Sequence, residues 1–207
     1  LKGGPAFHVA GSGGHAKVVI GTLLAAGERV EAAWDDDLAR VGSSVLDVPV
    51  RGPIDAIPSG ALVVVAIGAN ESRRDVAQRL RGREFGVVVH PSASVGQSVV
   101  LGPGTVVFAG AVLQPDARLG DHVIVNTGAT VDHDCRLENF VHIGPGVRLA
   151  GAVTLREGAF LGVGASVIPG VEVGAWATVG AGGVVLRPVP RGSVVVGCPA
   201  RPIDKRE

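Results

Sequence analysis

The chain of 207 residues contains no tyrosine and no methionine, and aromatic residues make up only 3% of it. Its 19 Lys and Arg balance 19 Asp and Glu, so there is no excess of charge of either sign. A neutral chain has no net attraction for nucleic acid or for an anionic membrane, and neither is expected as a partner. It also lacks an apolar run of membrane-spanning length and a signal-peptide pattern, which predicts a cytoplasmic protein.

Cysteine is scarce as well. Cys135 and Cys198 are the two cysteines, and their spacing fits neither a metal site nor a disulfide framework, so no metal is expected. What the chain has in abundance is glycine, with 32 residues, in a sequence that is 46% hydrophobic. A core built mostly from Val, Leu, Ile and Ala predicts many thin, similar layers.

The C-terminal half repeats every six residues. Cut into hexads from Val89, it gives seventeen consecutive units that all begin with Val, Leu or Ile, without insertion or deletion. The fifth position holds only Ala, Val, Thr, Cys or Gly. A six-residue period fits a parallel β-helix with three short strands per coil, in which the first residue points inward and the fifth fills a tight corner. Seventeen hexads then make between five and six coils.

The N-terminal half alternates between strand and helix patterns. Strands are predicted at residues 6–11, 29–37 and 61–70, and helices at residues 11–27 and 71–82, the second of them polar. This alternation predicts a small parallel α/β domain with a Rossmann-like arrangement. The predicted domains are residues 1–88, which bind a nucleotide sugar, and residues 89–207, a β-helix with a C-terminal tail.

A glycine-rich turn follows the first predicted strand. Gly11, Gly13 and Ala16 fit the pattern G-x-G-x-x-A, and Asp35 comes 24 residues after Gly11. Such a turn lets the backbone approach a phosphate at a helix N-terminus, although a βα turn without a ligand gives the same pattern. A dinucleotide needs two mononucleotide halves and the domain has room for one, which favours a nucleotide sugar over NAD.

Two histidines of the repeat are candidate functional residues. His133 is third in its hexad and His142 is sixth in the next, so both should point out of the β-helix. Asp134 beside His133 is placed to fix the imidazole tautomer and raise its basicity, whereas an isolated surface histidine is usually only solvated. Cys135 occupies an inward fifth position, which makes it a poor acyl-carrying nucleophile.

Six segments occur in an order typical of one group of enzymes: GSGGHAKVV, WDDD, AIGANESRR, NTGATVDHDC, FVHIGPGVRLAG and GCPARPI. Over residues 7–203 the chain resembles the bacterial sugar O- and N-acetyltransferases of left-handed β-helix fold. This group includes sialic acid O-acetyltransferases and enzymes that acetylate UDP-linked 4-amino sugars. The handedness of the helix is an expectation from this resemblance and not from the period.

The resemblance also implies a homotrimer that binds acetyl-CoA between neighbouring β-helices. It implies that His133 is the general base, with Asp134 as its support. The acetyl-CoA contacts that it implies are His142, Gly151, Val163 and Ala181. The contacts to the nucleotide sugar that it implies are Gly13, Gly14 and His15 at the phosphates, with Asp35 and Asp36 near the nucleotide.

The sequence therefore predicts an acetyl-CoA-dependent acetyltransferase that modifies a nucleotide-linked amino sugar, at a 4-amino group, by direct transfer. Three other readings remain open. The first is a sugar O-acetyltransferase. The second is a γ-type carbonic anhydrase, which would need zinc on three histidines such as His122, His133 and His142. The third is a non-catalytic scaffold that only binds nucleotide sugars.

Overall fold

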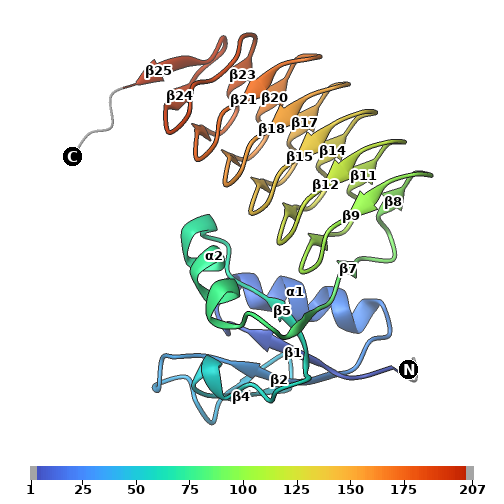
Figure 1. The fold of residues 1–207 in the computed structure, drawn as a ribbon, viewed down its shortest axis with the longest axis vertical. Helices are drawn as coiled ribbons and strands as arrows, with labels where there is room; N and C mark the ends of the chain where they lie inside the picture. Colours follow the sequence, from blue (N-terminus) through green and yellow to red (C-terminus); the bar gives the residue numbers. More distant parts are fainter. Residues whose placement is uncertain (1–3, 204–207) are drawn as a thin grey trace.

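The computed structural model describes residues 4–203, and its first part is a six-stranded sheet of order β3-β4-β2-β1-β5-β6 (Figure 1). The pairs are parallel except for the antiparallel hairpin of β3 with β4. The elements are β1 Phe7–Ala10, α1 Gly14–Ala25, β2 Val30–Trp34, β3 Ser44–Val45, β4 Val48–Arg51, the 3-10 helix η1 Ile54–Ala56, β5 Leu62–Val65, α2 Asn70–Arg79 and β6 Glu84–Phe85.

This sheet has one helix on each face. Val19, Ile20 and Leu23 of α1 belong to one hydrophobic cluster with strand residues, and α2 contributes to a separate cluster on the other face. The three strands and two helices predicted from the sequence are present, and the hairpin β3–β4 is an addition. Its turn, Leu46 and Asp47, has positive φ angles of 48° and 63° without the Asn-Gly pair that usually marks such a turn, so no local pattern predicts the hairpin.

The rest of the described chain is a left-handed β-helix with three walls. Wall 1 consists of β7 Val88–Val89, β10 Val106–Val107, β13 Ile124–Val125, β16 His142–Ile143, β19 Phe160–Leu161, β22 Thr178–Val179 and β24 Val194–Val196, with the antiparallel β25 Arg201–Ile203 at its end. Wall 2 consists of β8 Ser94–Val95, β11 Val112–Leu113, β14 Thr130–Val131, β17 Arg148–Leu149, β20 Ser166–Val167 and β23 Val184–Val185. Wall 3 consists of β9 Val100–Leu101, β12 Arg118–Leu119, β15 Arg136–Leu137, β18 Thr154–Leu155 and β21 Glu172–Val173.

From β7 to β23, strands pair in parallel with the strand 18 residues further on, for example Val125 with Ile143, whereas β22 pairs with β24 at a spacing of 16 residues. The second residue of each strand points into the core, as Leu137 does at 2% exposure, and the first points outward. Fifth-position residues such as Cys135 and Ala159 are fully buried in the same cluster. The β-helix predicted from the hexads is thus confirmed, with each inward side chain stacked on its equivalent in the next coil.

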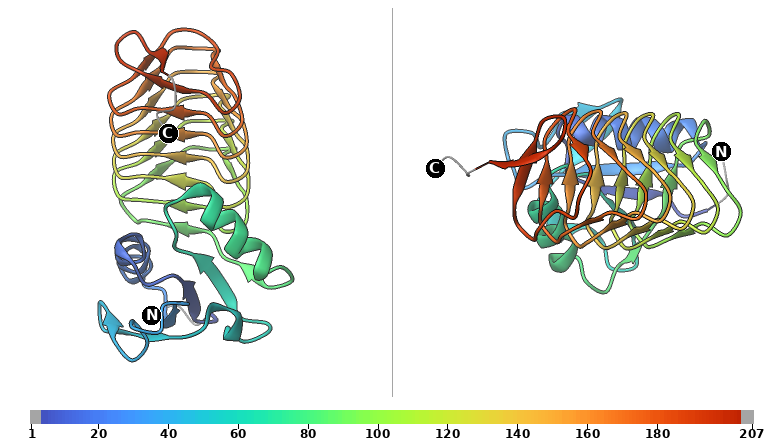
Figure 2. Two further views of the ribbon diagram at one scale, coloured as in Figure 1. Left: turned by 90° about the vertical axis from the view of Figure 1, so that its left-hand side faces the viewer. Right: turned by 90° about the horizontal axis from the view of Figure 1, so that it is seen from above.

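The two parts of the molecule share a core. Val106 and Phe108 on the outer side of wall 1 belong to the same buried cluster as Val19 and Leu23 of α1. On the other side of the sheet, Phe140 packs against the cluster that contains Leu80. The helices therefore cover the first coils of wall 1, above which the later coils stack (Figure 2). No helix within residues 4–203 is both long enough and apolar enough to cross a membrane.

Candidate active site

His133 lies on the edge between wall 2 and wall 3, in the turn from β14 to β15. Its side chain is exposed, and its Nδ1 is 2.7 Å from the Oδ2 of Asp134. Asp134 has a φ of 60°, a left-handed conformation that aspartate tolerates better than most residues. Despite its short side chain, Asp134 therefore reaches the imidazole.

This contact determines how His133 behaves as a base. The hydrogen bond to Asp134 raises the pKa of His133 above its ordinary value of 6.5, and the nearby charge of Asp132 acts in the same direction. Because only a protonated Nδ1 can donate to a carboxylate, the neutral ring presents its lone pair at Nε2. The arrangement is that of a general base oriented by a neighbouring acid.

Gly151 lies one coil beyond His133 on the same edge. A β-carbon at Gly151 would lie 2.6 Å from both Cε1 and Nε2 of His133. Glycine at this position therefore leaves room for the imidazole, and the structure brings these two predicted site residues together.

His142 has the opposite environment. It is the outward residue of β16 on wall 1, but the loop between β5 and α2 covers it and leaves it 9% exposed. Burial, followed by the positive charge of Arg73, lowers the pKa of His142 to about 4. His142 is thus neutral at physiological pH, with Nδ1 3.1 Å from the carbonyl oxygen of Gly68.

The two histidines of one chain do not share a site. In a three-walled helix, the edge between walls 2 and 3 is opposite wall 1. His133 and His142 therefore lie on opposite sides of the β-helix. A site that uses both must combine His133 of one chain with His142 of another.

A cavity of about 640 Å³ opens beside His142, between the start of α2 and wall 1. Phe160, Thr178 and Trp176 line its wall side. The Trp176 indole lies over Gly158, where a β-carbon would collide with it, and under the guanidinium of Arg74 at 4.7 Å. Trp176 itself has a φ of 57°, which is unusual for a bulky residue, so the surrounding contacts hold it in place.

A second cavity, of about 480 Å³, lies over the glycine-rich turn and contains the five predicted nucleotide-sugar residues. A β-carbon at Gly13 or Gly14 would meet nothing within 4 Å, so the backbone of this turn is open to a ligand. Gly13 is the residue that precedes α1, whose first N–H groups have no side-chain cap. An anion would find free donors there. Both cavities include Gly68, where they meet.

The acids of this cavity already have partners within the chain. Asp35 Oδ2 accepts hydrogen bonds from the backbone N–H of Ser12 at 2.9 Å and from its hydroxyl at 2.5 Å. Burial raises the pKa of Asp35, but the Ser12 and Asp37 hydrogen bonds outweigh it and leave the pKa below its ordinary value. Asp36 is paired with Arg79 at 2.7 Å and accepts from the N–H of Ile54. Both acids thus shape the turn as well as line the cavity.

The His15 side chain lines this cavity and also packs toward wall 1. Its ring packs edge-on against Phe108 at 5.5 Å and lies 6.2 Å from the ring of His142. Burial, together with Arg73, lowers the pKa of His15 to about 4, and its Nε2 is buried without a hydrogen-bond partner. The structure therefore places His15 between the two cavities, where a neutral imidazole is favoured.

Three comparisons with known proteins identify the family and the fold of the chain. Residues 7–80 match the family model of the PglD N-terminal domain. The acetyltransferase domain of PglB from Neisseria gonorrhoeae is 39% identical over 97% of this chain and 100% of that chain, with a TM-score of 0.91. A variant of perosamine N-acetyltransferase from Caulobacter crescentus, solved with CoA and GDP-perosamine, is 45% identical over 97% of both chains, also with a TM-score of 0.91.

The chain belongs to the bacterial sugar acetyltransferases of left-handed β-helix fold. UDP-N-acetylbacillosamine N-acetyltransferase of Bacillus subtilis (strain 168) is a further relative, 41% identical over 109 residues. That alignment spans 49% of this chain and 50% of the Bacillus protein. The PglB domain has also been solved in complex with acetyl coenzyme A.

In this acetyltransferase, the other predicted coenzyme residues lie on a different edge from His133. Val163 and Ala181 are in the turns between wall 1 and wall 2, one coil apart, and Val163 is exposed. Gly182 donates its N–H to the carbonyl of Val163 at 2.8 Å, so the two turns stack. The structure groups these residues with wall 1 and not with Gly151.

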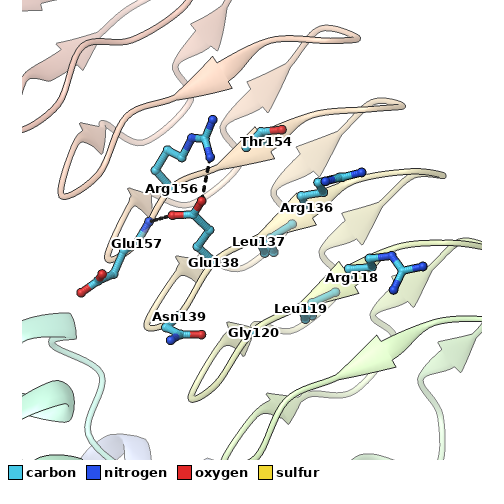
Figure 3. A pocket seen from close by; sticks show the side chains of 10 residues that line it. All are labelled: Arg118, Leu119, Gly120, Arg136, Leu137, Glu138, Asn139, Thr154, Arg156 and Glu157. Carbon is cyan, nitrogen blue, oxygen red and sulfur yellow. Dashed lines mark hydrogen bonds and ion pairs between the residues drawn. The ribbon is translucent and has the colours of Figure 1, made fainter.

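A third hollow, of about 470 Å³, lies on wall 3 and contains none of the predicted site residues (Figure 3). Arg156 bridges Glu138 at 2.8 Å and Glu172 at 2.6 Å there. The outward side chains of Arg118 and Arg136 stand on adjacent strands of the same wall (Figure 3). These exposed ion pairs contribute little to stability on their own.

Zinc chemistry of the carbonic anhydrase kind has no support from the arrangement of side chains. Within residues 4–203, no three His, Cys, Asp or Glu side chains come together as a metal site. His122, the third histidine of that reading, is buried between Phe140, stacked at 5.2 Å, and Phe85. It serves as part of an aromatic core and not as a surface ligand.

Sequence reasoning missed several residues that line or support the cavity beside His142. Gly68 and Asn70 fall at the end of the strand predicted over residues 61–70, whereas in the structure β5 ends at Val65 and Asn70 begins α2. Phe160 and Trp176 are outward residues of the β-helix, whose hexad pattern does not constrain them. No local pattern predicts that the first part of the chain folds over this portion of wall 1.

Proposed function

We propose that this chain transfers the acetyl group of acetyl-CoA to the amine of a nucleotide-linked amino sugar, with His133 as general base. The observation that carries the proposal is the His133–Asp134 pair, an exposed and oriented base on the edge of an acetyltransferase β-helix. Two of the relatives named above, the Bacillus and Caulobacter proteins, are named as N-acetyltransferases, which favours nitrogen as the acceptor atom. The 4-amino group is the target that the resemblance of the sequence implies.

In the proposed mechanism, the neutral amine of the sugar attacks the thioester carbonyl carbon. His133 Nε2 accepts the proton that the nitrogen loses, and Asp134 stabilises the imidazolium that results. Collapse of the tetrahedral intermediate breaks the C–S bond, and the proton passes to the departing sulfur. The products are the acetamido sugar and free CoA.

Direct transfer is favoured over an acyl-enzyme. Cys135 is fully buried, and burial raises the pKa of its thiol to about 11. Such a thiol is neither accessible nor ionised at physiological pH. Holding both substrates in one cleft then supplies the rate advantage of proximity.

The proposed binding of the sugar nucleotide begins at the glycine-rich turn. The diphosphate lies over Gly13 and Gly14 at the N-terminus of α1, where backbone N–H groups are free to donate. Asp35 and Asp36 face the ribose and base from the same cavity. The sugar extends past Gly68 toward the cavity beside His142, since the two cavities meet there.

A homotrimer completes the proposed site. One chain offers His142 and the stacked turns of Val163 and Ala181, while His133 and Gly151 lie on its far side. A neighbouring copy that places its His133 edge against this surface supplies the base, and acetyl-CoA lies in the cleft between them. Closed three-fold symmetry gives three identical clefts.

The test measures acetyl-CoA-dependent thiol release with a panel of UDP-, GDP-, dTDP- and CMP-linked amino sugars. Binding is followed in parallel by thermal shift, because a ligand at 100 times its Kd adds about 2.7 kcal/mol of stability. Turnover with at least one amino sugar, and none with its hydroxyl counterpart, is the expected result. Binding of nucleotide sugars without any turnover would instead indicate a scaffold.

Gly13→Val tests the nucleotide site separately. Gly13 has an ordinary φ of −78° and open space beside it, so valine fits the free protein. The added side chain occupies the space of the phosphate, and KM for the sugar nucleotide should rise at least about tenfold while KM for acetyl-CoA stays constant. An equal rise in both constants would contradict this assignment.

A further inference from the structure

Arg73 is the most buried charged side chain of the described chain, at 1% exposure. It lies on α2, and within residues 4–203 it forms no ion pair with a carboxylate. Its guanidinium instead donates five hydrogen bonds of 2.8–3.1 Å, to the carbonyls of His122, Ile67, Gly68 and Phe140 and to the Oδ1 of Asn70. A buried charge is tolerated when its donors are satisfied in this way.

These bonds join the two parts of the molecule. Ile67 and Gly68 belong to the loop between β5 and α2, and Asn70 is the first residue of α2, whereas His122 and Phe140 are turn residues of the β-helix. The Asn70 amide adds hydrogen bonds to the carbonyls of Gly158 and Ala159. Arg73 thus fixes the loop on wall 1 at the place where the two cavities meet.

The loop carbonyl that Arg73 holds also binds His142. The Gly68 oxygen accepts from Arg73 Nη1 at 3.0 Å and lies 3.1 Å from His142 Nδ1. The Oδ1 of Asn126 accepts the N–H of Thr127, so the amide nitrogen of Asn126 faces His142 Nε2 at 3.3 Å. Both contacts require the same neutral tautomer, with the proton on Nδ1 and a lone pair on Nε2.

We propose that Arg73 is a positioning residue for acetyl transfer, which acts by anchoring the Gly68 carbonyl so that His142 keeps its proton on Nδ1 and an accepting Nε2. His142 Nε2 then accepts an N–H or O–H of a bound substrate in place of the Asn126 amide, which faces it in the free protein, and does not donate to the substrate. This inference rests on the proposed function, in which His142 contacts acetyl-CoA. Arg73 can fix the contact between Gly68 and His142 because its hydrogen bonds reach both the α/β part and the β-helix.

Electrostatics agree with this assignment. Burial is the largest cause of the lowered pKa of His142. The charge of Arg73 on α2 and His15 on α1 lower it further, whereas the hydrogen bond to Gly68 raises it. Glu71 of α2 lines the same cavity. Loss of the Arg73 charge should therefore make His142 easier to protonate, and an opening of the loop that exposes the imidazole would act in the same direction.

The first experiment needs no activity. Ring ¹⁵N spectra of the free wild-type protein, assigned with His142→Gln, should show His142 neutral and protonated on Nδ1 from pH 5 to 8. In Arg73→Met, the midpoint of the His142 titration should move to higher pH, and the neutral ring should no longer be protonated on Nδ1 alone. In the matched control Arg81→Met, an exposed arginine just beyond α2, the spectrum should not change. A wild-type His142 protonated on Nε2, or charged at pH 6, overturns the proposal even if Arg73→Met does not fold.

The second experiment is a double-mutant cycle on kinetics. Arg73→Met and His142→Gln should each raise KM for acetyl-CoA by roughly tenfold, and the double variant should be no worse than either. Arg73→Lys keeps the positive charge but lacks the five N–H donors of the guanidinium. It should therefore restore the wild-type midpoint of the His142 titration more fully than it restores KM for acetyl-CoA. Additive effects in the cycle would mean that Arg73 acts through the fold alone, which overturns the inference. Failure of the wild type to acetylate any amino sugar would instead refute the proposed function and leave the spectra interpretable.

Discussion

His133 and His142 are nine residues apart on the same β-helix, yet their environments differ in every respect. His133 stands on an exposed edge beside Asp134, and this contact raises its pKa. His142 stands on wall 1 beneath the β5–α2 loop, and burial lowers its pKa to about 4. A repeat of nearly identical coils therefore acquires two chemically distinct imidazoles.

The difference comes from what covers each surface. The edge between walls 2 and 3 is open to solvent or to another subunit, whereas the first coils of wall 1 are covered by the α/β part of the same chain. A charged imidazole is hydrated on the exposed edge but desolvated on the covered part of wall 1. The first histidine is suited to accept a proton during the reaction, and the second to accept a hydrogen bond without changing charge.

Among the variants that test this comparison, His133→Ala should have the largest effect. Loss of the base should lower kcat by about 10²–10⁴ while stability stays unchanged, because the exposed side chain supports no core contact. Measurements of kcat at saturating substrates and of thermal unfolding check both parts. If the variant keeps more than roughly a tenth of wild-type kcat at neutral pH, His133 is an ordinary surface residue.

The buried histidines should make the free energy of unfolding fall at acid pH. His15, His122 and His142 each have a pKa lowered to about 4, first by burial and then by Arg73. Since the folded pKa lies below the unfolded value of 6.5, the stability they confer is complete above pH 6.5 and is lost as pH falls toward 4. Unfolding near pH 5 takes up close to three protons, so its free energy should fall by roughly 4 kcal/mol per pH unit.

Urea unfolding between pH 5 and 7 measures this slope. His142→Gln should reduce it by roughly a third, whereas His133→Ala should not reduce it, because the pKa of His133 is shifted in the other direction. Equal slopes in wild type and His142→Gln would show that His142 is not desolvated in solution.

Gly151→Ala should disturb His133 without touching His142. The new methyl group would lie 2.6 Å from the imidazole and displace it from the Asp134 contact. A drop in kcat of roughly tenfold is expected, with little change in stability, because the imidazole is free to move outward. Gly21→Ala in α1 is the matched control, since its β-carbon would make only an ordinary contact with Leu46 at 3.8 Å. Equal kcat for Gly151→Ala and the control would separate Gly151 from the base.

Asp134→Asn is the smallest expected change. Removal of the carboxylate lowers the pKa of His133, and a base is active only when neutral. The acidic limb of kcat/KM should therefore move to lower pH, by no more than about one unit. The pH profiles of kcat/KM are compared for wild type and variant with the same substrate. Protonation of the sugar amine affects both profiles equally, so it does not contribute to the difference. A limb that does not move would assign the ionisation to another group.

Much of the fold was predictable from the sequence, because its causes are local. One aliphatic residue and one small corner residue in every six are required by the geometry of the coil, and they recur from Val89 onward without interruption. The first strand and the glycine-rich turn after it were equally clear. The exposed pair of His133 and Asp134 was also predictable, since both residues lie in the same turn and need no distant partner.

Only the tertiary structure decided what the other site residues do. The helix that carries Arg73 looks polar in sequence, and an arginine there would be assigned to solvent. Its burial, the covering of His142 and the placement of His15 all depend on segments more than 45 residues apart in the chain that meet at wall 1. Periodicity fixes which side of a coil a residue faces, but desolvation depends on whatever packs against that side, and no local pattern encodes that partner.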